Sequence, residues 1–161
     1  MTILAAICRR LDEAGVTYRR VRHEPTRTSE ESAKSRGEEI RIGGKALVIK
    51  TGDVFRLFVL SAASRLDSAA IRDRFGVKNI RFATASELES LTGLVPGSVP
   101  PFGEPILALE LFVDESIRAN ERIAFNAGSL TDSIVMSTAD YFRIASPTEF
   151  RFSQSVESNG T

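Results

Sequence analysis

Gly43-Gly44-Lys45-Ala46-Leu47-Val48-Ile49 is the most informative stretch of the sequence, together with the loop Gly97-Ser98-Val99-Pro100-Pro101-Phe102-Gly103. In the first stretch a lysine opens a run that is apolar enough to form a buried strand. In the second, glycines let the backbone approach a ligand closely and prolines fix the shape of the loop. A lysine that enters a buried strand without an obvious carboxylate nearby favours an anionic ligand. An ordinary loop followed by a lysine whose charged end reaches solvent explains Lys45 equally well.

The same apolar stretch begins a predicted hairpin, in which Thr51-Gly52-Asp53 separates Lys45–Lys50 from Val54–Ala62. Outward from it, helical spacing predicts helices over residues 3–14, 29–36, 68–75, 85–92 and 138–144. Their predicted N-caps include Thr28 with Glu31, Asp67, and either Thr84 with Glu87 or Ser86 with Glu89. Further strands are predicted over Thr17–His23, Ile80–Ala83, Ile106–Val113, Ile123–Phe125 and Ser133–Met136.

Strands outnumber helices in this pattern, and hairpins are mixed with crossovers. We therefore expect an α+β fold with a mixed, partly closed, β-barrel-like sheet and surrounding helices. Residues 1–152 are expected to form a single domain, and the polar tail over residues 153–161 is expected to be disordered.

The composition is that of a globular protein, with 42% hydrophobic and 26% charged residues in a chain of 161. No apolar run approaches the roughly 20 residues that cross a bilayer, so no membrane partner is expected. Charged residues interrupt the N-terminal segment, which therefore does not resemble a signal peptide. A single cysteine, Cys8, excludes an internal disulfide and fits a cytoplasmic location.

Charge is unevenly distributed along the chain although the formal net charge is zero. Residues 1–50 hold 11 Lys and Arg against 7 Asp and Glu, whereas residues 51–161 hold 10 against 14. The arginine-rich first part fits contact with nucleic-acid phosphates. A solvated helix face and an exposed strand edge explain it equally well.

Several kinds of catalytic site are excluded by residues that are missing. With one histidine, His23, and one cysteine, Cys8, no zinc or iron site can be assembled from these ligands. The sequence also lacks a nucleophile elbow, a phosphate-binding loop and a dinucleotide fingerprint, so no cofactor and no metal are expected. A structural or pocket-rim role suits His23 better than that of a base, and Cys8 fits burial as a small hydrophobe.

The remaining candidates are a lysine, glycine-rich loops and a helix N-terminus at Thr28-Ser29. Backbone amides can polarise a carbonyl oxygen, while a cation and a helix dipole can bind phosphate. A reaction that uses only these groups needs an activated substrate such as an ester, with water or a substrate hydroxyl as the nucleophile.

The order of several segments resembles the YbaK/EbsC family, a domain also found inserted in, or associated with, prolyl-tRNA synthetases. The resemblance covers roughly residues 15–145. It is carried by His23, Thr28-Ser29-Glu30-Glu31-Ser32-Ala33, Gly44-Lys45-Ala46-Leu47-Val48, the stretch from Leu91 to Gly103, Val113-Asp114-Glu115-Ser116 and Phe125-Asn126-Ala127-Gly128-Ser129.

This resemblance implies a β-barrel-like fold and a free-standing trans-editing hydrolase that cleaves the ester of mischarged aminoacyl-tRNA, most often tRNA for proline with a small non-cognate amino acid. The implied partner is the 3′ acceptor end of the tRNA, with an aminoacyl-tRNA synthetase as an optional second one. By the same resemblance, Lys45 holds the 3′-terminal adenosine phosphate. The Gly97–Pro101 loop forms the wall that limits side-chain size, and Gly128 brings its backbone to the scissile carbonyl.

The chain departs from the alanine-specific members of that family at two places. Those members follow the lysine with asparagine and place a histidine after the glycine turn, where this chain has Ala46 and Ser129-Leu130. A pocket for serine, threonine, cysteine or a small unnatural aliphatic acid therefore fits as well as one for alanine.

The candidate site thus has two catalytic residues, Lys45 and Gly128. Within it the loop of residues 97–102 is expected to act as a size filter, because its prolines restrict the backbone. Ser129 and Asp132 are candidates for polar contacts to the amino acid or a water, although a solvated turn would also hold them. The predicted substrate-binding residues are His23, Thr28, Gly97, Ser98, Val99, Pro101, Phe102, Ser129 and Asp132.

Three functions fit these observations. An editing deacylase explains the order of the motifs. A non-catalytic module that docks on tRNA or a synthetase would explain the shortage of acid–base groups. An esterase acting on a small ester without tRNA is the third.

Overall fold

The computed structural model describes residues 1–26 and 28–155, and it confirms the α+β class. The helices are α1 (Ile3–Glu13), α2 (Ser29–Arg36), the short 3₁₀ helix η1 (Ile40–Ile42), α3 (Ser68–Phe75), α4 (Ala85–Thr92), α5 (Glu115–Arg118) and α6 (Thr138–Ala145). The strands are β1 (Tyr18–Arg22), β2 (Gly44–Thr51), β3 (Val54–Ser61), β4 (Ser64–Leu66), β5 (Ile80–Phe82), β6 (Leu111–Val113), β7 (Arg122–Asn126), β8 (Asp132–Ser137), β9 (Thr148–Glu149) and β10 (Ser153–Ser155).

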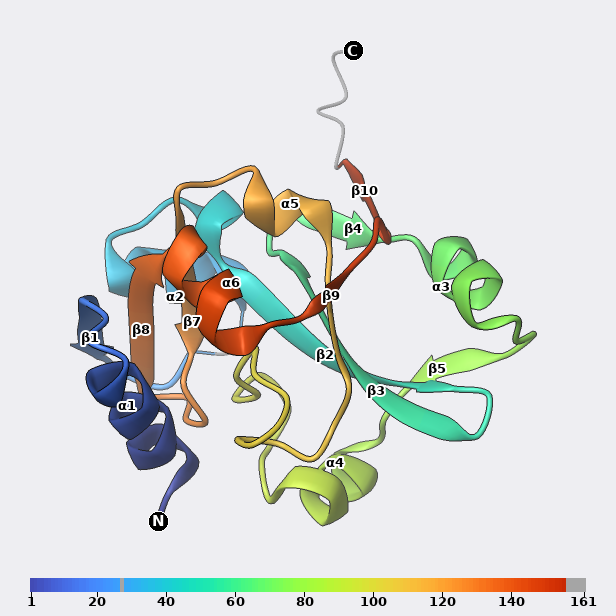
Figure 1. Cartoon of the computed structure of the whole chain (residues 1–161), viewed down its shortest axis with the longest axis horizontal. Helices are drawn as coiled ribbons and strands as arrows, with labels where there is room; N and C mark the ends of the chain where they lie inside the picture. The colour runs from blue at the N-terminus through green and yellow to red at the C-terminus, as the bar shows by residue number, and fades with distance from the viewer. Residues whose placement is uncertain (27, 156–161) are drawn as a thin grey trace.

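The predicted hairpin is confirmed and lies at the centre of the molecule (Figure 1). β2 and β3 pair antiparallel from Gly44 opposite Ser61 to Thr51 opposite Val54. β5 adds to the outer edge of β2, while β6 and β9 extend the other side in parallel, giving the order β5-β2-β3-β6-β9. The sheet is therefore mixed, as expected.

A second sheet of order β1-β8-β7 lies beside the first, and β10 pairs with β4 in a third. A single parallel bridge between Gly43 and Ala124 links the start of β2 to β7. Among the residues that the structure describes, the sheets do not close into a barrel, and this bridge provides the partial closure. Gly44 permits it, because a Cβ there would lie 2.9 Å from Cδ1 of Ile123.

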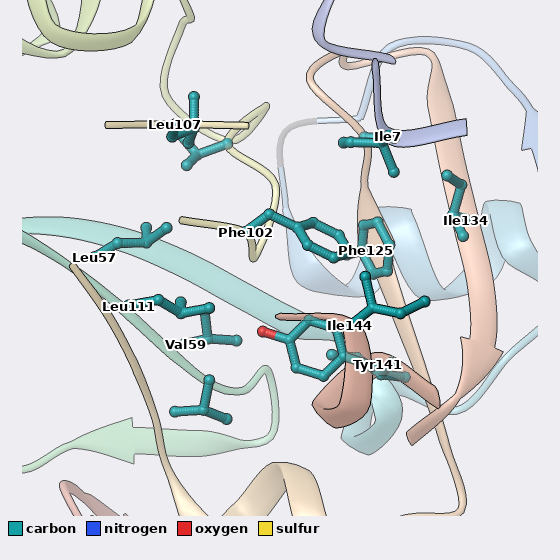
Figure 2. Packing of buried hydrophobic residues seen from close by; sticks show 14 of the residues in the cluster. Ile7, Leu57, Val59, Phe102, Leu107, Leu111, Phe125, Ile134, Tyr141 and Ile144 are labelled. Carbon is teal, nitrogen blue, oxygen red and sulfur yellow. The ribbon is translucent and has the colours of Figure 1, made fainter. Parts of the chain in front are cut away.

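The core lies on both sides of the central sheet. On one side α1, α6 and both larger sheets enclose a cluster in which Phe102 packs edge-on against Phe125 and Tyr141, at ring-centroid distances of 5.5 Å for each pair (Figure 2). On the other side a second cluster under α3 is rich in phenylalanine and includes Phe58 and Phe112.

Capping residues fix the helix starts as predicted. Thr28 with Glu31 and Thr84 with Glu87 form reciprocal capping boxes at α2 and α4, and the Asp67 side chain caps α3. None of the helices in the described part of the chain has the length and apolar character needed to span a membrane.

Two expectations are wrong in part. Only Leu111–Val113 of the predicted strand Ile106–Val113 is a strand, because residues 106–110 form turns that bury Leu107 and Leu109 without extended backbone. The disordered tail was expected from Ser153, yet Ser153–Ser155 forms β10. Asp114 anchors this segment by accepting from the backbone N–H of Phe152. The rest of that prediction, residues 156–161, lies outside the described residues.

Candidate functional site

A cavity of about 150 Å³ lies where β2 begins. Both sequence stretches singled out above contribute to its wall, 43–49 through residues 43–47 and 97–103 through Gly97 and Val99. The start of α2 adds Thr28 and Ser29, and the end of β7 adds Asn126. The cavity thus lies beside the bridge that joins the two larger sheets.

Lys45 is half-buried at this cavity, and its Nζ donates a hydrogen bond to the carbonyl oxygen of Ser64 at 3.0 Å. Burial lowers the pKa of Lys45 below its ordinary value, and the negative charge of Glu30 partly offsets this. No carboxylate lies within ion-pair distance of Nζ among the described residues. The lysine is therefore held by a neutral group and keeps donors for a ligand.

A second cation, Arg36, lies in the same wall and is only 7% exposed. Its Nε donates to Oγ of Ser133 at 2.9 Å, and its Nη2 donates to Oδ1 of Asn126 at 3.2 Å. Its Nη1 lies beside Gly43 and has no hydrogen-bond partner among residues 1–26 and 28–155. Desolvation lowers the pKa of Arg36 to about 10, which leaves the guanidinium charged at neutral pH.

A polar network connects Arg36 to the loop of Gly97. Oγ of Ser133 is 3.1 Å from Oδ1 of Asn126, whose Nδ2 donates to the carbonyl oxygen of Gly97 at 2.7 Å. His23 joins from the other side, with its Nε2 2.8 Å from Oγ of Ser133. The network therefore fixes the position of the loop relative to the buried cation.

His23 is held in one tautomer when it is neutral. Its Nδ1 is 2.8 Å from the carbonyl oxygen of Glu24, which can only accept a hydrogen bond. Nδ1 must therefore carry the hydrogen, so Nε2 of neutral His23 can only accept, and the single hydroxyl hydrogen of Ser133 is shared between Nε2 and Oδ1 of Asn126. His23 does not line the cavity, so the structure places it behind Ser133 as a support.

The N-terminal end of α2 adds to the positive potential of the cavity. Ser29 and Ser32 of α2 both line the wall, and the buried hydroxyls of Ser32 and Thr26 are 2.8 Å apart. The helix dipole directs partial positive charge toward this end. Among the described residues, the lining includes two cations and no Asp, Glu, His or Cys.

Four of the predicted site residues line this cavity, namely Lys45, Thr28, Gly97 and Val99. The rest of the predicted size filter lies behind the wall. Ser98 folds back to donate to the carbonyl oxygen of Val95 at 2.8 Å, the Pro101 carbonyl accepts from the Tyr141 hydroxyl at 2.6 Å, and Phe102 belongs to the core.

The predicted residues after β7 do not line the cavity. Gly128 has φ +77°, and a Cβ there would lie 2.7 Å from Cγ2 of Ile3, so its close approach is to α1. Ser129 donates to Oδ2 of Asp132 at 3.1 Å within the turn. Burial acts to raise the pKa of Asp132, but hydrogen bonds from Ser129 and Thr131 and the nearby arginines outweigh it and lower the pKa.

Sequence reasoning missed Arg36 and Asn126 as site residues. The signal for Arg36 was its spacing from Ser29, Ser32 and Ala33, which places the four on one face of α2. A helix face of small residues with one arginine indicates that this face packs closely against the rest of the protein and places a single positive charge there. Asn126 follows the predicted strand Ile123–Phe125, but nothing local shows that its side chain reaches Gly97.

The fold is shared with a solved structure provisionally assigned as a trans-editing enzyme for prolyl-tRNA synthetase. The TM-score is 0.81 at 23% identity, over 96% of this chain and 98% of that one. This likeness defines the class of protein as one with the editing-domain fold.

The family follows from the sequence comparisons. A profile described as the aminoacyl-tRNA editing domain matches residues 23–144. The chain is 35% identical to the multifunctional Ser/Thr-tRNA deacylase ProXp-y of Escherichia coli K12 over 143 aligned residues. The alignment covers 85% of this chain and 84% of that protein. The chain therefore belongs to the aminoacyl-tRNA editing domain family, which confirms the resemblance and the expected enzyme class, an aminoacyl-tRNA deacylase that edits mischarged tRNA.

Two further relatives extend the comparison. The prolyl-tRNA editing protein ProX of Acetoanaerobium sticklandii is 25% identical over 144 residues, covering 86% of this chain and 88% of that protein. A proline–tRNA ligase of Shouchella clausii is 33% identical over 101 residues, which are 63% of this chain and 18% of the ligase. Related domains thus occur both free-standing and within a synthetase.

Proposed function

We propose that this deacylase removes small amino acids with a hydroxyl side chain, serine and threonine first, from tRNA for proline. The observation that carries the proposal is the lining of the cavity, in which Lys45 and Arg36 suit an anionic substrate and Thr26, Ser32 and Asn126 suit a small polar side chain. The name of the relative from E. coli supports the choice of amino acids, and the similarity to a proline–tRNA ligase supports the choice of tRNA.

Lys45 is proposed to bind the phosphate of the 3′-terminal adenosine. An ammonium group has three N–H donors, and here one of them is directed to the carbonyl of Ser64. Charge-assisted bonds to phosphate strengthen where water is partly excluded, as it is around this half-buried side chain. The negative charge of a bound phosphate would raise the pKa of Lys45 and so offset the lowering that desolvation causes.

The proposed reaction is hydrolysis without a metal. Water adds to the ester carbonyl carbon, the ester C–O bond breaks, and the ribose oxygen leaves and takes up a proton. Backbone amides of the glycine loops are proposed to polarise the carbonyl. Gly44 and Gly97 line the cavity and are candidates for this role beside Gly128, which the resemblance implies, whereas the backbone N–H of Gly43 donates to the carbonyl oxygen of Ile40.

The amino acid side chain is proposed to lie against Thr26, Ser32 and Asn126, with Val99 and Gly97 limiting its size. Thr26 and Ser32 share one hydrogen bond, which leaves one hydroxyl hydrogen of the pair for a substrate hydroxyl, and an aliphatic side chain of the same size would leave that hydrogen without a partner. The side chain of proline is an apolar ring, so it would contact these same residues without making a hydrogen bond to them.

The test is deacylation of seryl-tRNA for proline by Lys45→Ala and by Lys45→Arg. We expect Lys45→Ala to lower kcat/KM by about 10-fold to 150-fold, the equivalent of losing a charge-assisted hydrogen bond of about 1.5–3 kcal/mol. Lys45→Arg keeps the charge and should retain part of the activity. Circular dichroism and thermal unfolding establish that both variants are folded. Wild-type kcat/KM in folded Lys45→Ala would remove Lys45 from the site.

A further inference from the structure

Phe82 is unlike every other phenylalanine of this chain. The sequence has ten, and nine of them make a ring–ring or cation–ring contact. Phe82 makes neither within the described residues, and it is 58% exposed. It ends β5, where it pairs with the fully buried Ile49 of β2. A large aromatic ring is therefore presented to solvent at the edge of the central sheet.

Beside Phe82 lies a hollow of about 190 Å³ whose lining residues are all of apolar type. Phe82 and Pro96, both exposed, stand at its rim, and Leu88 of α4 forms part of its base. Two more exposed apolar side chains, Leu91 and Val95, come from the same segment of the chain. Exposed apolar surface gathered around a hollow is typical of a binding site.

This hollow adjoins the cation-lined cavity. Ala46, Leu47, Gly97 and Val99 line both of them, so the two spaces are separated only by the edge of β2 and the loop of Gly97. A ligand that fills the cavity and is longer than it can extend into the hollow. The part in the cavity would be polar and anionic, and the part in the hollow would be flat and apolar.

We propose that the hollow binds the terminal nucleobase of the tRNA, stacked on Phe82. This inference rests on the proposed function, because it takes the ester to lie in the cavity. In an aminoacyl-tRNA one ribose separates the ester from the terminal adenine, so a base must lie next to any site that holds the ester. The face of a nucleobase stacks on aromatic side chains, and apolar walls accept it without hydrogen bonds to its edges.

The absence of tryptophan from the sequence makes the test direct. Phe82→Trp introduces a single tryptophan whose emission is quenched when a base stacks on it. The probe is a short uncharged single-stranded RNA that ends in CCA, compared with the same RNA whose last nucleotide keeps its ribose and phosphate but lacks the base. We expect saturable quenching by the first RNA and at least fivefold weaker apparent binding of the second.

The matched control is Val54→Trp. Val54 is also exposed, at the start of β3, and pairs with Thr51, about 10 Å along β2 from Val48 in the hollow. Its emission should not respond to either RNA. Equal quenching of Phe82→Trp by both RNAs would overturn the proposal. So would unchanged emission at concentrations where fluorescence anisotropy of labelled RNA shows binding.

A kinetic measurement separates failure of the subsite from failure of the proposed function. Phe82→Leu keeps apolar volume but removes the aromatic face, and it should raise KM for seryl-tRNA by roughly 5-fold to 100-fold with little change in kcat. If wild type is active and Phe82→Leu has the same KM, the base site is wrong and the proposed function stands. If wild type hydrolyses no ester but quenching still depends on the terminal base, the proposed function fails and the base site stands.

Discussion

Lys45 and Arg36 both bring positive charge to one cavity, but the fold holds the two charges differently. Lys45 is half-buried and bonded to a single backbone carbonyl. Arg36 is buried and fixed by Ser133 and Asn126. These hydrogen-bond partners are all neutral, and Glu30 and Glu38 act on the two cations only from beyond ion-pair distance, so an anionic ligand can complete the pairing. This is the arrangement expected of a binding site rather than of a structural ion pair.

Replacing Arg36 tests whether this buried charge serves the substrate. We expect Arg36→Gln to lower kcat/KM for seryl-tRNA by about 10-fold to 100-fold, since a charge-assisted contact is lost. Stability should also fall by about 1–3 kcal/mol, because Ser133 and Asn126 lose their donor. Chemical denaturation and steady-state kinetics measure the two effects.

Arg36→Lys is the matched control for charge without the planar fork. It should recover part of kcat/KM relative to Arg36→Gln. If Arg36→Gln loses stability but keeps the wild-type kcat/KM, Arg36 holds only the loop in place and does not act on the substrate.

Single residues also show where sequence reasoning stops. Lys45 is recognisable locally as a candidate, because the charge precedes an apolar run. The surroundings of Gly128 are not visible, because the side chain that its backbone approaches is Ile3, at the other end of the chain. Likewise Phe102 stands in a loop that is typical of a binding wall, yet it packs on Phe125 and Tyr141. The direction of a side chain depends on distant partners that no local pattern encodes.

Among the elements, α2 connects stability to the site most directly. Its first turn lines the cavity, and the Thr28 capping box fixes that turn. α4 has the same kind of box at Thr84, but Thr84 lines neither the cavity nor the hollow. The two boxes therefore form a matched pair in which the local chemistry is the same and the surroundings differ.

Thr28→Ala and Thr84→Ala test this difference. Each should lower the free energy of unfolding by about 0.5–2 kcal/mol, because each removes a side-chain cap. We expect only Thr28→Ala to lower kcat/KM as well, and Thr28→Ser, which keeps the cap, to restore it. Equal loss of kcat/KM in the two alanine variants would mean that the start of α2 has no special role in the site.

The loop of Gly97 is the element that carries specificity in this account. Val99 is buried and belongs to the wall of both spaces, so Val99→Ala should enlarge the cavity. The Val99→Ala variant should release larger amino acids faster relative to serine. Its free energy of unfolding should fall by on the order of 2 kcal/mol. Gly97 has φ +88°, so Gly97→Val would be strained and should impair even the preferred substrate. An unchanged rank order of substrates in both variants would place the filter elsewhere.

Elements differ in how far they could be predicted. The hairpin at Gly52 and the caps at Thr28, Asp67 and Thr84 depend on neighbouring residues, and all are confirmed. The apolar run Ile106–Val113 was mostly not a strand, because burial alone does not determine backbone conformation. β10 was missed because Asp114, the residue that anchors it, lies far away in the sequence.

At the scale of the whole molecule, the site exists because two sheets meet. The bridge between Gly43 and Ala124 joins the sheet of β2 to that of β7, and the cavity opens beside this junction. One sheet contributes Lys45, and the other contributes Asn126 and, through Ser133, the support of Arg36. No single segment of the sequence contains the site, which explains why its two central motifs could be predicted but its complete lining could not.

This editing deacylase is proposed to act without a metal and to have its site at Lys45. The most direct test measures release of serine, threonine, alanine, cysteine and proline from tRNA for proline, by wild type and Lys45→Ala, with and without EDTA. We expect wild type to release serine and threonine faster than proline, EDTA to have no effect, and Lys45→Ala to be strongly impaired. Folded wild type that releases none of the five amino acids above the buffer rate would contradict the account, as would activity that EDTA abolishes and zinc restores.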